Sequence, residues 1–194
     1  VYILSKHPKI KIINLCATKN LGKDISFFDK RIKKKLPKIS STKSIKWNNL
    51  DLIFLLLPNG EAQKIIKSTY NRYKNLNYID LSADFRISNP KIFKKNYKFS
   101  HKSKNLINKS LYSISEFCYK KISKYRIISN PGCYPTSIQI PLIPLIKKKL
   151  IKTNDITIDS KSGYSGAGKT FKKKFNYKNF YKSTYAYSVN NHRH

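Results

Sequence analysis

Residues 51–60 read DLIFLLLPNG, and this stretch indicates the fold class most clearly. The apolar run over residues 51–57 is continuous, which is typical of a strand buried on both faces of a parallel sheet. The turn-forming sequence Pro58-Asn59-Gly60 ends the run. Residues 61–73 then show the periodicity of a crossover helix. Its expected apolar stripe consists of Ala62, Ile65, Ile66 and Tyr70.

The rest of the chain continues this alternation of short apolar runs with longer mixed segments. Further strands are expected at residues 10–17, 77–81, 126–129 and 155–161. Residues 137–150 have a helical composition interrupted by Pro141 and Pro144, which predicts a kinked helix. We therefore predict an α/β fold with a parallel sheet, in which ligands bind at the carboxyl ends of the strands.

Composition places the chain among globular proteins. Its 194 residues are 40% hydrophobic, enough for one ordinary domain or parts of two. Three cysteines without paired spacing predict no disulfide framework, and no apolar run approaches the ~20 residues of a membrane span. Residues 1–11 lack the features of a secretory signal. We expect a cytoplasmic protein without a membrane partner and, because the sequence has no Met, a processed chain or a fragment.

The net charge of +32 raises nucleic acid as a partner, because clustered basic residues release counterions from phosphates. Lysine supplies most of this charge, and its runs at residues 33–35, 147–149 and 172–174 are spread out without an aromatic platform. Residues encoded by A/T-rich codons are abundant, namely Lys, Asn, Ile, Tyr and Phe. We therefore interpret most of the charge as mutational drift of solvated surface positions in an A/T-rich genome. We expect no nucleic-acid partner, and a basic nucleic-acid-binding module stays open as the alternative.

Residues 130–136 read NPGCYPT and place one thiol on a sharp turn ahead of an apolar segment. Pro131 and Gly132 suit a tight reversal, and Pro135 fits a first helical turn. A helix start carries about half a positive charge, which stabilises a thiolate over a thiol. The pattern predicts that Cys133 is a nucleophile for activated carbonyl groups.

The other two cysteines fit structural positions. Cys16 lies inside an apolar run, and Cys118 lies beside Glu116 and Phe117. Both are expected to be small buried side chains, the commoner state of a lone cysteine. The same alternative applies to Cys133, but its Pro-Gly turn favours chemistry.

Residues 80–86 read DLSADFR and combine two carboxylates, a hydroxyl and a guanidinium in one passage from strand to loop. One interpretation is a loop closed by Asp and Ser side chains on nearby amides. The other gives Arg86 a phosphate to hold, because its planar fork matches a phosphoryl group better than lysine does.

Residues 163–170 read GYSGAGKT and match the phosphate-loop pattern of nucleotide hydrolases. Only 24 residues follow Thr170, too few for the metal-binding strand and most of the sheet of such a domain. We interpret the stretch as a small-residue loop whose amides approach an anion. A nucleotide hydrolase stays open as the alternative.

Residues 192–194 read HRH and close the chain. Two alternating histidines without an acidic or thiol partner make a poor metal site, so no metal is expected. A surface cluster is one interpretation. The other is that His192 or His194 is the acid/base partner of Cys133.

Four of these blocks together resemble the N-acetyl-gamma-glutamyl-phosphate reductase family, within the semialdehyde dehydrogenase superfamily. The blocks are residues 80–86, 129–136, 162–169 and 192–194, and residues 55–60 and 112–117 are similar to two weaker blocks. The resemblance runs through nearly the whole chain. Aspartate-semialdehyde dehydrogenases share the architecture and the cysteine.

The resemblance implies a Rossmann-like NADP-binding domain over residues 1–130 that lacks its first strand and Gly-rich turn. It implies the start of an α+β catalytic domain of the glyceraldehyde-phosphate-dehydrogenase-like type over residues 131–194. The implied reaction is NADPH-dependent reduction of N-acetyl-glutamyl phosphate, a small acyl phosphate, to the semialdehyde in arginine biosynthesis, through a thioester on Cys133. A homo-oligomer is implied for the full-length protein.

The resemblance also assigns roles to individual residues. His192 or His194 is the implied acid/base. The implied substrate-binding residues are Arg86, Glu116, Asn130 and Arg193. The implied cofactor-binding residues are Pro58, Asn59, Gly60, Ser82, Ser162, Gly163, Ser165, Gly166, Ala167 and Gly168.

The chain departs from the family pattern in several places. Nothing before Lys11 supplies the first strand and Gly-rich turn, and the chain stops at its His-Arg-His block, so we expect truncation at both ends and little activity of the isolated chain. Lys169 stands where the family usually has Arg, and Ser113 and Ser115 replace a Gly and a Pro. N-acetyl-aminoadipyl phosphate, one carbon longer, stays open as the substrate.

Overall fold

The computed structural model of the protein describes residues 1–163, 166 and 186. The chain divides into two compact units, residues 1–50 and residues 51–194. Each unit is considered by itself. The predicted domain boundary between residues 130 and 131 stays a prediction.

The first unit has little regular structure. It contains the helix α1 (Tyr2–Lys6) and two short parallel strands, β1 (Leu15–Cys16) and β2 (Ile39–Ser40), joined in the register Leu15 to Ile39. Three 3-10 turns complete it, at Ile25–Phe27, Thr42–Ser44 and Trp47–Asn49.

Two predictions for this unit are wrong. The strand expected over residues 10–17 is only two residues long, because its one neighbour among the described residues, β2, offers two residues for pairing. Cys16 is exposed rather than buried. Its Sγ lies 3.8 Å from Ser40 Oγ, on a strand pair too short to carry a packed layer over the thiol.

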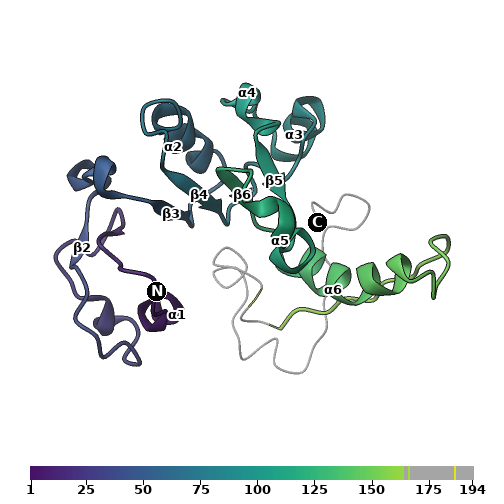
Figure 1. Ribbon diagram of the computed structural model, residues 1–194, viewed down its shortest axis with the longest axis horizontal. Helices are drawn as coiled ribbons and strands as arrows, with labels where there is room; N and C mark the ends of the chain where they lie inside the picture. Colours follow the sequence, from purple (N-terminus) through teal and green to yellow (C-terminus); the bar gives the residue numbers. More distant parts are fainter. Residues whose placement is uncertain (164–165, 167–185, 187–194) are drawn as a thin grey trace. The chain divides into compact units, whose positions relative to one another are not determined.

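The second unit is built on a four-stranded parallel sheet (Figure 1). The predicted α/β class with a parallel sheet is confirmed. The strand order is β3-β4-β6-β5, and the register aligns Leu55 with Asp80, Asp80 with Ser129, and Ser129 with Tyr112. All four strands therefore end at one edge. Their bounds are β3 (Leu52–Leu55), β4 (Asn77–Asp80), β5 (Ser110–Tyr112) and β6 (Ile127–Ser129).

Helices follow the strands as the crossover pattern requires. The helix α2 (Glu61–Thr69) buries Ala62 and Ile66 completely, as its stripe predicts. Asn89 caps α3 by accepting hydrogen bonds from the Lys91 and Ile92 amides. The bounds of the remaining helices are α3 (Pro90–Tyr97), α4 (Lys104–Ile107), α5 (Ser115–Ile122) and α6 (Cys133–Lys147).

The strand β3 is less buried than its apolar run predicts. Leu55 is buried, but Leu52 is exposed, as is Leu56 just beyond the strand. The reason is position, because among the described residues β3 pairs only with β4 and forms an edge of the sheet. The prediction of a parallel strand is confirmed, and the prediction of burial on both faces is wrong.

The segment after α6 also differs from expectation. Residues 155–161 form no strand, and Ile156 and Ile158 are exposed. A strand needs a neighbour to accept its backbone hydrogen bonds, and the described residues provide none here. The alternation of apolar and polar residues was therefore misleading at this site.

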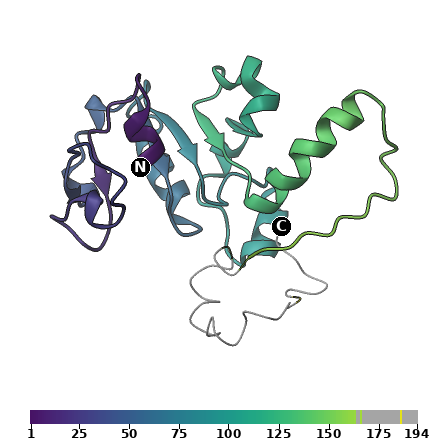
Figure 2. The same cartoon turned by 90° about the horizontal axis from the view of Figure 1, so that it is seen from below.

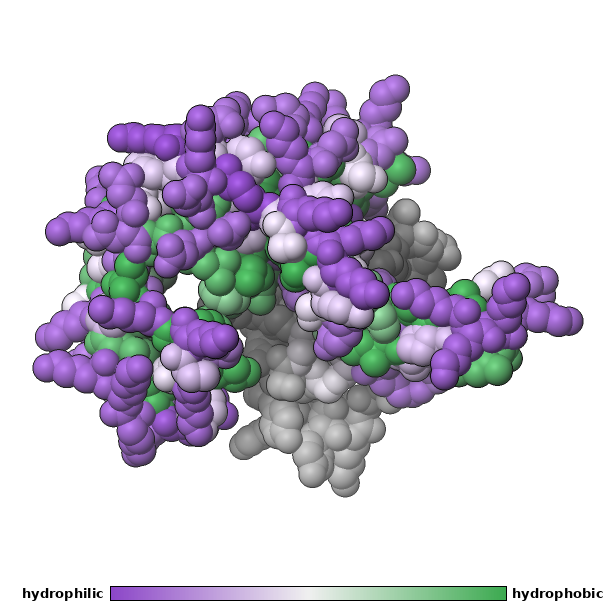
Figure 3. Space-filling model, viewed as in Figure 1, coloured by the Kyte–Doolittle hydropathy of each residue, from purple (hydrophilic) through white to green (hydrophobic). Residues whose placement is uncertain are grey.

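The helix α6 begins four residues earlier than predicted, at Cys133, and contains Pro141 and Pro144. None of its residues is buried, and both ribbon views show it leading away from the sheet (Figures 1 and 2). Elsewhere, hydrophilic side chains cover most of the face shown in Figure 3. Within the described residues, no helix is long and apolar enough to cross a membrane.

His101 is a buried titratable group in the second unit. Its ring lies edge-on to the rings of Phe85 and Phe93, at centroid distances of 5.1 and 4.9 Å. The Ser103 amide donates to Nδ1 over 3.0 Å, so Nε2 carries the proton and donates to the Asp84 carbonyl over 2.9 Å. Burial lowers the pKa of His101 below its ordinary value of 6.5, and Lys104 adds to this effect while Asp84 opposes it.

This environment predicts an acid-sensitive contribution to stability. The folded state favours neutral His101, so below pH 6.5 the unfolded state binds a proton more readily than the folded state does. As the pH is lowered from 6.5 to the lowered pKa of the folded state, the free energy of unfolding therefore decreases. Above that window His101 contributes no pH dependence. Urea titrations from about pH 8 to 5 measure this slope.

The matched comparison is between His101→Gln and His7→Gln, since His7 is exposed. The slope below pH 6.5 should flatten in the first variant and persist in the second. An unchanged slope in His101→Gln would contradict the assignment.

Candidate active site

Cys133 lies where the sequence predicts it, at the carboxyl edge of the sheet. The strand β6 ends at Ser129, three residues form a link, and Cys133 is the first residue of α6. Its side chain is exposed. The first turn of a helix leaves backbone N–H groups without intrahelical acceptors, so the thiol lies at a site of positive potential.

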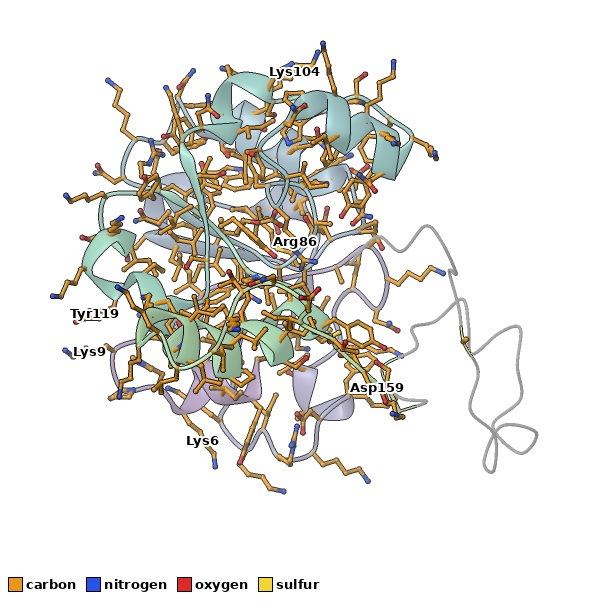
Figure 4. The ribbon with its side chains drawn as sticks, turned by 90° about the vertical axis from the view of Figure 1, so that its right-hand side faces the viewer. Lys6, Lys9, Arg86, Lys104, Tyr119 and Asp159 are labelled. Carbon is orange, nitrogen blue, oxygen red and sulfur yellow. The ribbon has the colours of Figure 1, made fainter. Side chains whose placement is uncertain are left out.

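Arg86 is held beside this helix start. Its Nε donates to the Asn130 carbonyl over 2.9 Å and its Nη2 to the Leu81 carbonyl over 3.1 Å. A Cβ built on Gly132 would lie 3.0 Å from Nη1, so the guanidinium passes directly over the glycine that precedes Cys133. In Figure 4, Arg86 lies among the side chains of the second unit, whereas Lys104 and Tyr119 stand at its outside.

A hollow of about 390 Å³ opens at the same edge. It brings together three of the predicted site residues, namely Asn59, Ser82 and Arg86. The remaining lining residues are mostly apolar or aromatic. They are Leu57, Leu81, Ala83, Ile87, Tyr97, Tyr112 and Pro135.

The turn Pro58-Asn59-Gly60 contributes Asn59 to the lining of the hollow and leads into α2. Gly60 has φ +92°, a conformation that residues with a side chain rarely adopt, and its amide donates to Asp84 Oδ1 over 2.6 Å. Pro58 and Asn59 are exposed. The turn therefore presents the Asn59 carboxamide at the edge of the sheet, while the buried Gly60 amide is bound by Asp84.

Asp80 ends β4 and is completely buried. Its Oδ1 accepts from the Ser82 amide over 2.9 Å, while Asp80 Oδ2 and Ser129 Oγ have no hydrogen-bond partner among the described residues. Burial is the main cause that raises the pKa of Asp80, and the nearby Asp84 charge adds to it. This carboxyl lies beneath the site and supports the loop rather than facing the hollow.

Other predicted site residues lie apart from this group. Glu116 is exposed in the first turn of α5 and does not line the hollow. Its pKa is lowered mainly by a hydrogen bond from its own backbone amide, and the Ser115 hydroxyl, 2.9 Å from Oε2, adds to this. Asn130 is exposed and contributes its carbonyl to Arg86.

The small-residue loop is only partly described. Ser162 and Gly163 are exposed, and the Gly166 amide donates to the Gly163 carbonyl over 2.9 Å. The remaining predicted site residues lie outside the described residues. They are Ser165, Ala167, Gly168, His192, Arg193 and His194.

A larger hollow, of about 530 Å³, lies in the first unit. It is lined by an apolar stretch with Lys11, Lys34 and Lys35 and contains none of the predicted site residues. The smaller hollow is the candidate active site, because Arg86 and Pro135 of the first turn of α6 line it at the carboxyl edge of the sheet. Cys133, two residues before Pro135, does not line the hollow. Among the described residues, no group of three or more His, Cys, Asp or Glu side chains is arranged to bind a metal ion.

Two residues near the site were missed by sequence reasoning. The Asp84 carboxylate accepts hydrogen bonds from the Gly60 and Gln63 amides, and His101 binds the Asp84 carbonyl. The second acid of DLSADFR was a visible signal for Asp84, although its partners lie 21 and 24 residues away. His101 carries no local signal.

Comparison with known proteins gives two matching family models. Residues 1–125 match the model described as semialdehyde dehydrogenase, NAD binding domain. Residues 133–194 match the model described as semialdehyde dehydrogenase, dimerisation domain.

Individual relatives are similar over the whole chain. An N-acetyl-gamma-glutamyl-phosphate reductase of Ehrlichia canis is 42% identical, and the chain covers 56% of its length. A probable chloroplastic enzyme of the same name from Oryza sativa is 39% identical, with 46% of its length covered. The Afipia carboxidovorans reductase is 35% identical, with 56% covered.

The chain thus spans about half the length of the curated relatives it matches. The NAD-binding-domain model alone matches well over half of the chain, in the part that includes three of the four strands of the sheet. The parallel sheet, the thiol at its carboxyl edge and these matches agree, and the chain belongs to the semialdehyde dehydrogenase family.

Proposed function

We propose that the full-length protein is an N-acetyl-gamma-glutamyl-phosphate reductase, which reduces an acyl phosphate to an aldehyde in arginine biosynthesis. The observation that carries this proposal is the exposed Cys133 at the start of α6 with the Arg86 guanidinium over the preceding glycine. Relatives of that name match every part of the chain, which supports the same activity.

The proposed chemistry uses the thiol as a nucleophile. The Cys133 thiolate attacks the acyl carbonyl carbon, the bond from that carbon to the phosphate oxygen breaks, and a thioester and inorganic phosphate form. A two-electron reduction of the thioester, with hydride supplied by a bound nicotinamide cofactor, gives the aldehyde and restores the thiolate. His192 or His194 is proposed as the acid/base, by resemblance alone.

Arg86 is proposed to bind the anionic substrate. Main-chain carbonyls of Leu81 and Asn130 fix two of its nitrogens, so its orientation is set before substrate arrives. A preorganised guanidinium stabilises phosphate charge without paying for reorganisation. We propose that backbone N–H groups of the first turn of α6 stabilise the developing oxyanion, a contribution of about 3 kcal/mol per donor in comparable enzymes. Glu116, Asn130 and Arg193 remain proposed substrate contacts.

The residues present fit a nicotinamide dinucleotide. The hollow opens at the carboxyl edge of a parallel sheet, where such cofactors bind, and is lined largely by apolar and aromatic side chains together with Asn59 and Ser82. We propose NADP(H) as the cofactor. The proposed contacts are Pro58, Asn59, Gly60, Ser82, Ser162, Gly163, Ser165, Gly166, Ala167 and Gly168.

Assembly and location are part of the same proposal. The dimerisation-domain match supports a homo-oligomer, with a catalytic domain that begins near residue 131. All three cysteines are free, which fits a reducing compartment, and we propose the cytoplasm.

Replacing the nucleophile tests the proposal. In the full-length protein, Cys133→Ser should reduce NADPH oxidation with N-acetyl-glutamyl phosphate by more than ~10³-fold, because a hydroxyl at neutral pH is a far weaker nucleophile than a thiolate. Cys16→Ser, at another exposed cysteine, is the matched control and should keep full activity.

The substrate is tested in the same assay. Aspartyl phosphate and N-acetyl-aminoadipyl phosphate replace N-acetyl-glutamyl phosphate, and the proposed substrate should have the highest kcat/KM. If another acyl phosphate has the highest kcat/KM, the substrate assignment is wrong. If Cys133→Ser keeps its rate, the proposed function as a whole is wrong.

The contact between Gly132 and Arg86 gives a second prediction. Gly132→Ala puts a Cβ 3.0 Å from Arg86 Nη1 and should displace the guanidinium. The expected result is a KM for the acyl phosphate raised by about tenfold, or about 1.4 kcal/mol, with a similar defect in Arg86→Lys. Steady-state kinetics measure both variants, and an unchanged KM in both would show that Arg86 does not bind substrate.

A further inference from the structure

The Asp84 side chain joins two loops that line the candidate active site. It is completely buried, and its carboxylate accepts hydrogen bonds from the Gly60 amide over 2.6 Å and from the Gln63 amide over 3.0 Å. Both amides belong to the start of α2, where the helix dipole favours a negative charge. The carboxylate is therefore the cap of the helix that follows the Pro58-Asn59-Gly60 turn.

Asp84 itself is fixed from its own loop. Its amide donates to Ser82 Oγ over 3.2 Å, and its carbonyl accepts from His101 Nε2 over 2.9 Å. Ser82 and Arg86, two residues to either side of it, line the hollow. A shift of the carboxylate would therefore move both loops relative to each other.

The far side of the turn leaves little room for adjustment. A Cβ on Gly60 would lie 3.3 Å from the ring of Phe99, so the turn packs closely against that ring. Ser103 Oγ donates to the Gln63 carbonyl over 2.8 Å, and Gln63 Oε1 accepts from the Lys102 amide. The start of α2 is thus held by Asp84 on one side and by residues 99–103 on the other.

We propose that Asp84 is a positioning residue for the cofactor site. Its two charge-assisted hydrogen bonds hold the Pro58-Asn59-Gly60 turn at a fixed distance from Ser82 and Arg86. The cofactor and the substrate anion are thereby bound at the correct relative positions for reaction. The inference rests on the proposed function, because it assigns the turn to the cofactor. It differs from a purely structural role, since it predicts a local loss of cofactor binding.

The test compares two buried variants of the full-length protein. Asp84→Asn keeps the shape of the side chain, but its amide nitrogen opposes one of the two N–H donors. Tyr78→Phe removes a buried hydrogen bond, from Tyr78 Oη to Thr69 Oγ1 over 2.9 Å, at the other end of α2. The readouts are NADPH affinity by nicotinamide fluorescence, alkylation of Cys133 by iodoacetamide, thermal stability, and amide hydrogen exchange at Gly60 and Gln63.

We expect Asp84→Asn to weaken NADPH binding at least tenfold and to speed exchange at both amides at least tenfold, while Cys133 alkylation stays within twofold. Tyr78→Phe should lower the melting temperature and leave NADPH affinity within twofold. Should Asp84→Asn fail to fold, His101→Gln replaces it, with the same changes expected at about threefold or more, because it removes the imidazole from the Asp84 carbonyl and the Ser103 amide but leaves both hydrogen bonds of the Asp84 carboxylate.

Three outcomes would overturn the proposal. The first is an NADPH affinity of Asp84→Asn that stays within twofold of the wild type. The second is a loss of NADPH affinity in Tyr78→Phe as large as the loss in Asp84→Asn. The third is exchange at Gly60 and Gln63 that does not change. A wild-type protein that binds neither NADPH nor NADH refutes the proposed function. In that case, amide hydrogen exchange at Gly60 and Gln63 that stays unchanged in Asp84→Asn would separately refute the role of Asp84 in holding the turn.

Discussion

The register of the parallel sheet is the constraint on which the candidate site depends. Backbone hydrogen bonds hold β3, β4, β6 and β5 so that Leu55, Asp80, Ser129 and Tyr112 stand level. Three loops then leave the sheet at the same height, after β3, β4 and β6. A slip of one residue in any pair would turn buried side chains outward and carry its loop away from the others. Cys133, Arg86 and the turn before α2 all follow strand ends at this one edge because this register is kept.

Side chains then convert adjacent loops into one site. Arg86 joins the loop after β4 to the loop after β6 through the Asn130 carbonyl, and the Leu81 carbonyl holds it within its own loop. Asp84 joins the loop after β4 to the turn after β3 through two main-chain amides. The opposite charges of these two residues suit their tasks, since carbonyl oxygens attract a cation and the start of a helix attracts an anion. One short loop thereby aligns its neighbours on both sides.

The parts of the fold with a local signal were predictable. Three strands, the helix α2 and the helix start behind Cys133 follow from apolar runs, turn residues and the Pro-Gly turn. The strand β5 and the helices α3 to α5 were not anticipated, because Ser110-Leu111-Tyr112 carries little apolar character and becomes a strand only beside β6. Cys133 and Arg86 could be selected as candidates from sequence. Asp84 could be noted as the second acid of its block, but its amide partners could not be foreseen because they lie far along the chain, and His101 carries no local signal.

Gly60 and Gly132 show how this architecture limits which mutations the gene tolerates. At exposed positions, where solvated side chains meet few neighbours, lysine or asparagine introduces no steric conflict. At Gly60 the backbone angle and the Phe99 ring both exclude a side chain, and at Gly132 the Arg86 guanidinium occupies the space. At both turns the lack of a side chain is what allows the observed backbone path and the seat of the Arg86 guanidinium.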